Sequence, residues 1–284
     1  MPVILFSVYY PHENRFKLIR KGLIPLLDKI KYDGMDYFLS TYKGENITMM
    51  VDSSNMEVKT IIENHFHNFF VDNSIEVPEK KLPLNQLFLD FKPNSIHFWD
   101  YNPFKNRQRA LKKIIIQKNE SELSNKCLSV LSNNQSWDME ESVQFYLNIL
   151  IIIDCLLHFD SMVSTSVANI LQLNLKSKFN RKVNLYREYL KNGEGIYTSN
   201  SDSIIRHYEY IKKIVKSAEI KNSDLSDWIS IVKNLMNSPE SDFQISSSDL
   251  CGSLIFGINQ KIDLNPKGLV IALGVYQSLN KEKF

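Results

Sequence analysis

The sequence lacks the short motifs that identify the commonest catalytic sites. It has no glycine-rich loop to hold phosphates, no nucleophile elbow and no zinc signature. Its three cysteines, Cys127, Cys155 and Cys251, are odd in number and far apart, and no C-x-x-C pair occurs. A disulfide framework and a cysteine-based metal site are therefore not expected. Two of the cysteines lie in apolar runs, where cysteine behaves as a small buried hydrophobe, so a reducing compartment is the simplest interpretation.

The chain also lacks a strong charge imbalance and a long apolar run. Its formal net charge of +2 is too small to indicate nucleic-acid binding, and no basic block is interleaved with aromatic residues. The most apolar stretch, FYLNILIIIDCLLHF, includes Asn148 and Asp154 and is shorter than the roughly 20 residues that cross a bilayer. The first residues, MPVILFSVYYPHE, have neither the basic region nor the cleavage site of a signal peptide. We therefore predict a cytoplasmic protein without nucleic-acid or membrane partners.

The N-terminal part of the chain has the patterns of an α+β fold. Residues 3–10 alternate and favour a strand, and apolar residues at helical spacing predict a helix over 14–32, where Pro25 should produce a kink or a break. The stretch MDYFLSTYKGENITMMV predicts two strands around a turn at 43–46, and an amphipathic helix follows over 55–70. This order predicts an antiparallel or mixed sheet with helices on one face.

The remainder of the chain is predicted to be irregular and then mainly helical. Residues 71–108 contain four prolines and an aromatic cluster, and helical patterns predominate beyond them. At 284 residues the length permits one or two domains. We expect a sheet layer over 1–108 and a helical part over 109–284, with helices at 120–131, 138–158, 161–173, 178–191, 202–217, 224–236, 248–262 and 267–280.

The segment PNSIHFWDYNPF is the first candidate for chemistry. It gathers His97, Trp99, Asp100 and Tyr101 on a connection long enough to be functional. It is equally well interpreted as an aromatic plug that covers the sheet. The pair His65 and His67 is a poor metal site, because residues two apart on a helix point away from each other.

The segment SSSDLCGSLIFGINQK is the second candidate. Its apolar residues recur at helical spacing, yet one stripe of the same helix carries Ser253, Phe256 and Gln260. Either the segment is an ordinary buried helix, or it lines a site in which an apolar residue stands where a polar one would be expected.

The order of these segments along 1–284 resembles the C-terminal elimination domain of lantibiotic dehydratases, in its stand-alone form from thiopeptide biosynthesis. The stretches VYY, LIRKGLIPLLDKI and DYFLSTY resemble the opening strand, the proline-containing helix and the following "RY" strand of that family. NITMMV occupies the place of its "HLRLRF" strand, and FKPNSIHF resembles "YxPExxRY". SLIFGINQKIDLNPKGLVIALGVYQSL resembles the closing "SLIHMxxNR" helix and the last helix. The resemblance implies a single elimination-domain-like unit.

The residues that carry out elimination in that family are replaced in this chain. Eliminases of the family remove glutamate from glutamylated Ser/Thr with sheet arginines, a glutamate and the histidine of the closing helix. The "RY" arginine, the two strand arginines, the glutamate and arginine of "YxPExxRY" and the helix histidine correspond here to Thr41, Thr48, Met50, Asn94, His97 and Phe256. Without the cations and the histidine, nothing holds the leaving glutamate or takes the α-proton.

The same scaffold without those residues resembles the pyridine synthases of thiopeptide pathways. These join two dehydroalanines of a modified precursor peptide in a formal aza-[4+2] cycloaddition, with loss of water and of the leader peptide. The implied partner is a precursor that carries azoles, dehydroalanines and its leader, and other enzymes of the pathway are further candidate partners. The reaction needs no metal and no cofactor, so none is expected.

The resemblance implies an aromatic site with a few groups that move protons. The catalytic candidates are Ser253, which lies one helical turn before Phe256, then Tyr101 and His97. Mid-helix serines often bond back to the helix backbone, which is the alternative for Ser253. The substrate-binding candidates are Phe98, Trp99, Phe256, Asn259 and Gln260, and the candidates for holding an acidic leader are Arg107, Arg109, Lys112 and Lys113.

Two other functions stay open on the sequence. The chain is a glutamate eliminase of a split dehydratase if its catalytic residues have moved to other positions. It is a non-catalytic scaffold that binds leader peptide if one activity was lost without gain of another.

Overall fold

The computed structural model describes residues 3–30, 35–40, 45–53, 57–76, 91–101, 117–133, 138–157, 183–217, 224–236, 247–262 and 266–283. The chain divides into two compact units. The sheet unit comprises Met1–Lys112, Glu120–Gln135 and Gln260–Ile262, and the helical unit comprises Lys113–Asn119, Ser136–Asn259 and Asp263–Phe284.

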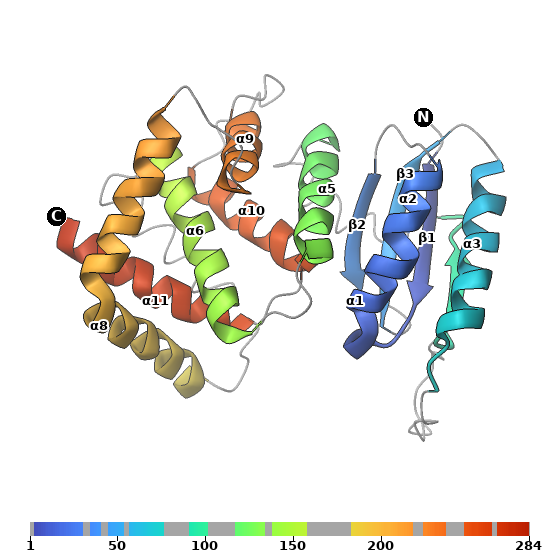
Figure 1. The fold of residues 1–284 in the computed structure, drawn as a ribbon, viewed down its shortest axis with the longest axis horizontal. Coiled ribbons are helices and arrows are strands. Elements are labelled where there is room, and N and C mark those ends of the chain that lie inside the picture. Colours follow the sequence, from blue (N-terminus) through green and yellow to red (C-terminus); the bar gives the residue numbers. More distant parts are fainter. Residues whose placement is uncertain are drawn as a thin grey trace. The chain divides into compact units, whose positions relative to one another are not determined.

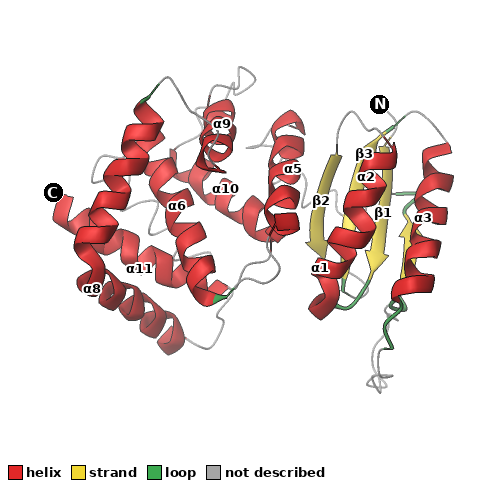
Figure 2. Ribbon diagram, in the orientation of Figure 1, coloured by secondary structure: helices red, strands yellow, loops and turns green. Residues whose placement is uncertain are grey.

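The sheet unit contains a four-stranded antiparallel sheet (Figures 1 and 2). The strand order is β2-β3-β1-β4, so the first strand of the chain is central and β2 and β4 are the outer strands. This confirms the predicted α+β class and shows that the pairing is entirely antiparallel among the described strands. The strands are β1 Val3–Tyr9, β2 Met35–Ser40, β3 Asn46–Asp52 and β4 Ser95–Phe98.

Strand β4 corrects the prediction of an irregular connection over 71–108. Its four residues are too few for a period-two pattern to be recognised, and Pro93 lies just before it. The structure stabilises its start locally: Asn94 has a positive φ of 58°, and its side chain both accepts from the backbone N of Ile75 (3.2 Å) and donates to the Ile75 carbonyl (2.8 Å). The pairing of β4 with β1 places His97 opposite Ser7, so both side chains lie on the same face of the sheet.

The register assigns the strand residues to two faces of the sheet. Ser7 is opposite both Thr48 of β3 and His97 of β4, so these three side chains share one face, which we call the Ser7 face. The opposite face carries Phe6, whose ring lies 5.7 Å from that of Phe98. We call it the Phe6 face.

Helices cover the Phe6 face. Helix α3 (Glu57–Asn73) places Phe66 with its ring centroid 6.1 Å from Phe6. The helix predicted over 14–32 is α1 (Arg15–Lys17), a π-helical turn η2 (Leu18–Leu23) and α2 (Ile24–Ile30). The wide turn ends two residues before Pro25, which has no N–H to continue a regular ladder. The predicted break at this proline is confirmed.

The π-helical turn also explains one of the two paired histidines. His65 donates from Nε2 to the carbonyl of Gly22 at 2.7 Å, and its Nδ1 accepts from Lys29 Nζ at 3.2 Å. Burial lowers the pKa of His65, against a smaller raising effect of the Gly22 hydrogen bond, and Lys29 lowers it further. His65 therefore has a structural role: its neutral imidazole links α3 to η2.

Two further segments belong to the sheet unit. Helix α5 (Gln117–Asn133) accepts a hydrogen bond from Arg20 at the carbonyl of Leu131, near its C-terminal end (3.4 Å). Helix α10 (Ser247–Ile262) belongs to the helical unit up to Asn259, and its last residues, Gln260–Ile262, belong to the sheet unit.

The helical unit confirms the prediction of a mainly helical C-terminal half. Its helices are α6 (Met139–Leu157), α8 (Val183–Lys216), α9 (Asp224–Met236), most of α10 and α11 (Pro266–Lys283). The predicted helices at 178–191 and 202–217 lie in α8, which consists of two helices that meet at a kink at Asn200, where the backbone is not helical. The helix predicted at 161–173 lies outside the described residues. Within the described part of the chain, no helix is long and apolar enough to cross a membrane.

Candidate active site

An aromatic cluster lies at the β4 side of the Ser7 face. The imidazole of His97 stacks on Phe91 (centroids 4.5 Å apart, planes at 24°) and meets the edge of Trp99 (4.4 Å, 77°). Tyr9 contacts Phe91 at 5.0 Å, and Tyr101 contacts Trp99 at 5.9 Å. Tyr101 is 61% exposed, whereas Trp99 is 8% exposed. The cluster therefore runs from a buried indole to an exposed phenol.

A chain of hydrogen bonds lies beneath the cluster. Trp99 Nε1 donates to Ser7 Oγ at 2.8 Å, and Ser7 and Thr48 share a hydroxyl–hydroxyl bond of 2.8 Å. Thr48 Oγ1 donates to Asn46 Oδ1 at 2.8 Å. All four side chains are buried. We call these four residues the hydroxyl chain.

The described strands contribute no lysine or arginine to the Ser7 face. Thr48 and Met50, which correspond to strand arginines in the resemblance, lie in a buried hydrogen-bond chain and against the apolar cluster of Leu5, Phe38 and Trp99, respectively. A departing carboxylate would find no lysine or arginine partner on these strands.

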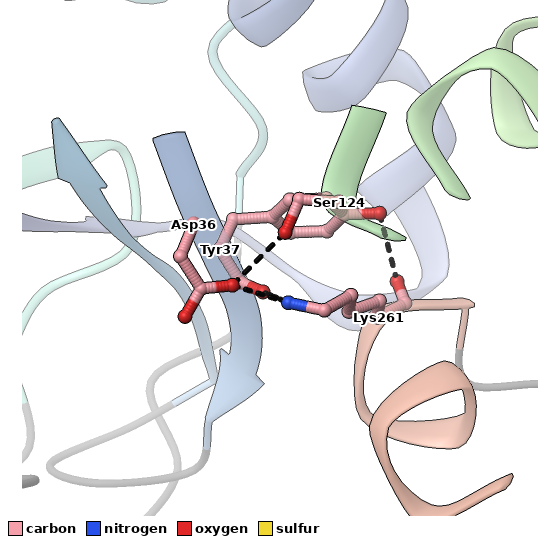
Figure 3. A network of polar contacts seen from close by, with 4 residues as sticks. All are labelled: Asp36, Tyr37, Ser124 and Lys261. Carbon is pink, nitrogen blue, oxygen red and sulfur yellow. Dashed lines mark hydrogen bonds and ion pairs between the residues drawn. The ribbon is translucent and has the colours of Figure 1, made fainter. Parts of the chain in front are cut away.

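Lys261, at the end of α10, does reach the sheet, but it is already paired. Its ammonium forms an ion pair with Asp36 at the outer strand β2 and donates to the Tyr37 carbonyl at 2.8 Å (Figure 3). Ser124 of α5 donates to the same carboxylate oxygen at 2.9 Å, and the Tyr37 hydroxyl donates to the Lys261 carbonyl at 3.4 Å. The side chains of Lys261 and Asp36 are 6% and 15% exposed. The network joins three segments that are far apart in the sequence.

The same neighbourhood contains a cysteine that is unsuited to nucleophilic chemistry. Burial raises the pKa of Cys127 to about 12, although Lys261 lowers it in part. Burial likewise raises the pKa of Tyr37 well above its ordinary value. Both groups are therefore neutral at physiological pH, and a neutral thiol is a poor nucleophile.

The structure brings together some of the predicted site residues and separates others. His97, Trp99 and Tyr101 belong to the aromatic cluster, whereas Phe98 points to the Phe6 face, under Lys59 (4.9 Å from Nζ to the ring centroid). Asn259 is buried in the helical unit, where its Oδ1 accepts from Tyr146 (2.8 Å).

The other candidates cannot be placed at the level of side chains. Ser253, Phe256 and Gln260 lie on α10, which confirms the helix, but their side chains are outside the described part. The segment with the proposed leader-binding residues also lies outside it, as does Thr41 of the "RY" position; those residues are Arg107, Arg109, Lys112 and Lys113.

Sequence reasoning missed Ser7, Phe91 and the pair Asp36–Lys261. Ser7 had a signal, since it is the polar residue in the middle of an otherwise apolar strand, VILFSVY. Asp36 and Lys261 had none, because they are 225 positions apart.

Comparison with known proteins supports the fold. No protein-family model matches the sequence, and no curated protein is significantly similar to it in sequence. Among solved structures, the pyridine synthase TbtD from thiomuracin biosynthesis matches with a TM-score of 0.69 and 14% sequence identity. The match covers 99% of this chain and 98% of TbtD.

Two further structures match over the whole of this chain. The tRNA-dependent lantibiotic dehydratase MibB from Microbispora sp. 107891 has a TM-score of 0.53 and 11% identity, and the match covers 29% of MibB. TsrL has a TM-score of 0.54 and 11% identity, with 96% of TsrL covered. The resemblance found in the sequence is thus confirmed at the level of the fold: this chain has the fold of the pyridine synthase TbtD and of part of a lantibiotic dehydratase.

Proposed function

We propose that this protein is a pyridine-forming macrocyclase of thiopeptide biosynthesis. It joins two dehydroalanines of a modified precursor peptide by a formal aza-[4+2] cycloaddition, and water and the leader peptide are lost. The observation that carries the proposal is the end-to-end match with a protein named as a pyridine synthase, which leaves almost no part of either chain unmatched.

The chemistry of the Ser7 face supports a cyclase over a glutamate eliminase. A cycloaddition between two alkenes of one flexible peptide mainly needs both held in a near-attack geometry, which supplies about 7–11 kcal/mol. Aromatic side chains such as Phe91, Trp99 and Tyr101 suit that task, because they contact azoles and alkenes without reacting with them. The described strands have no cation to hold a leaving glutamate, and Lys261 is occupied by Asp36.

The remaining steps need proton transfer. Tautomerisation of the amide and the losses of water and leader each gain about 10²–10⁴-fold from a positioned acid or base. On the proposed function, His97 and Tyr101 of the aromatic cluster, with Ser253 of α10, are the candidate groups. Trp99, Phe256 and Gln260 are the candidates for binding the modified core. Phe98, on the Phe6 face, and Asn259, which is buried against Tyr146, are not placed to join Trp99 in that task.

Turnover of a synthetic precursor tests the function. The purified protein is incubated with a precursor that already carries azoles and dehydroalanines, and the products are followed by mass spectrometry and absorbance. We expect release of the leader as a carboxamide together with a pyridine chromophore. Loss of glutamate from a glutamylated precursor would identify an eliminase instead, and binding without turnover would identify a scaffold.

The basic segment before α5 is proposed to hold an acidic leader. It brings four cations into a short stretch directly after the aromatic segment, and charge-assisted hydrogen bonds to carboxylates are strong. Replacing Arg107, Arg109, Lys112 and Lys113 together by Ala should weaken binding of an isolated leader peptide by at least tenfold at low salt. Calorimetry measures the affinity, and an unchanged affinity would show that the leader binds elsewhere.

A further inference from the structure

The hydroxyl chain has a defined direction. The Asn46 Oδ1 atom can only accept a hydrogen bond, so the Thr48 hydroxyl must donate its hydrogen to it. Ser7 must then be the donor in its bond with Thr48, and its lone pairs accept the indole N–H of Trp99. The protons therefore run in one direction, from Trp99 through Ser7 and Thr48 to Asn46.

This direction makes the orientation of Trp99 well determined. Ser7 and Thr48 are fully buried, so no bulk water replaces a bond that is broken. The indole is also confined by Leu5 and Phe38, which pack with it on the same face. The indole is thus held both by a hydrogen bond and by packing.

Trp99 in turn bounds the position of His97. The imidazole lies between Phe91, on which it stacks, and the indole, which it meets edge to face at 4.4 Å. Ser7 is also the direct cross-strand neighbour of His97. A rotation of the indole would therefore change the space that the imidazole occupies.

We propose that Ser7 and Thr48 are positioning residues that orient His97 through the Trp99 indole. The inference rests on the proposed function only for its catalytic meaning, since the geometry itself is independent of the reaction. Both hydroxyls are fully buried, so they act through the indole. Their task is to hold the indole so that His97 keeps the orientation it needs for proton transfer.

Two NMR signals test the positioning without any substrate. The protein has three tryptophans and six histidines, so the indole N–H of Trp99 and the ring Cε1–H of His97 can be assigned with Trp99→Phe and His97→Gln variants. In Ser7→Ala and Thr48→Val, hydrogen exchange of the Trp99 indole should accelerate at least tenfold. The His97 signal should move, because it loses the ring-current shift of a fixed indole. If both signals stay as in the wild type, the proposal is wrong.

Turnover tests the catalytic consequence, with Ser124→Ala as the matched control. That variant also removes a fully buried hydroxyl of the sheet unit, but one that bonds to Asp36. Ser7→Ala and Thr48→Val should lower kcat by roughly tenfold with little change in KM, since small misplacements of a reacting group are costly. Ser124→Ala should keep the wild-type kcat.

The outcomes separate this inference from the proposed function. If the wild type does not turn over the precursor, the proposed function fails, while the NMR signals still decide whether the hydroxyl chain orients His97. If the His97 signal moves but kcat equals that of the Ser124→Ala variant, the hydroxyl chain has no role in the reaction.

Discussion

Replacing Lys261 with methionine is expected to lower the free energy of unfolding of the sheet unit by about 3–5 kcal/mol. The substitution keeps most of the side-chain volume but leaves the Asp36 carboxylate without its cation. Both side chains are mostly buried, at 6% and 15% exposure, so water cannot fully replace the lost partner. Asp36 then retains the hydrogen bond from Ser124. The Tyr37 carbonyl loses the Nζ donor at the same time.

An exposed ion pair offers the same substitution as a control. Lys212 pairs with Glu209 at 3.1 Å within α8, where the side chains are 38% and 57% exposed. Lys212→Met should therefore change stability by less than about 1 kcal/mol. Urea unfolding followed by circular dichroism compares the two variants. Equal destabilisation would show that burial does not determine the strength of the Asp36 pair.

A second substitution separates the cost of an unpaired charge from the loss of a favourable contact. Adding Asp36→Leu to Lys261→Met removes the isolated carboxylate, and apolar replacements of buried pairs are often neutral or stabilising. The double variant is thus expected to be more stable than Lys261→Met alone. If it is less stable, the pair contributes favourable energy of its own, and a double-mutant cycle measures how much.

The fold was predictable where a pattern extends over many residues. Strands β1, β2 and β3 are runs of six or seven residues rich in apolar, β-branched and aromatic side chains, and the helices repeat apolar positions over several turns, so their types follow from the sequence alone. Strand β4 has four residues, which give no period, and only its pairing with β1 reveals it. The π-helical turn before Pro25 was likewise predictable as a break but not in its geometry.

The aromatic cluster was predictable in its residue types but not in its contacts. The aromatic segment could be singled out because His97, Trp99 and Tyr101 are close in the chain, yet alternation in β4 sends Phe98 to the other face. The indole of Trp99 bonds to Ser7, which precedes it by 92 positions. A single sequence contains no signal for such a pair, because each partner alone is an ordinary residue in an apolar surrounding. Whether Trp99 also stacks against substrate remains a prediction.

A close backbone approach between two helices of the helical unit gives the second large effect. Where α8 meets α11, a Cβ at Gly193 would lie 2.2 Å from the Ile271 carbonyl oxygen and 2.9 Å from the backbone of Gly274 and Val275. Backbone atoms cannot move aside as a flexible side chain can, so Gly193→Ala must push the two helices apart. We expect a loss of at least about 3 kcal/mol, the upper end of the usual cost of overpacking.

Gly195 provides the matched control on the same helix. No atom lies within 4 Å of a Cβ at this position, so Gly195→Ala adds a methyl group to open space. Alanine favours a helix over glycine by about 1 kcal/mol, and the variant should therefore be as stable as the wild type or slightly more stable. Thermal unfolding of the two variants provides the comparison. The prediction depends on α8 contacting α11 at Gly193. If the two variants are equally stable, the helices do not pack through this residue, and the arrangement of the helical unit would have to be revised.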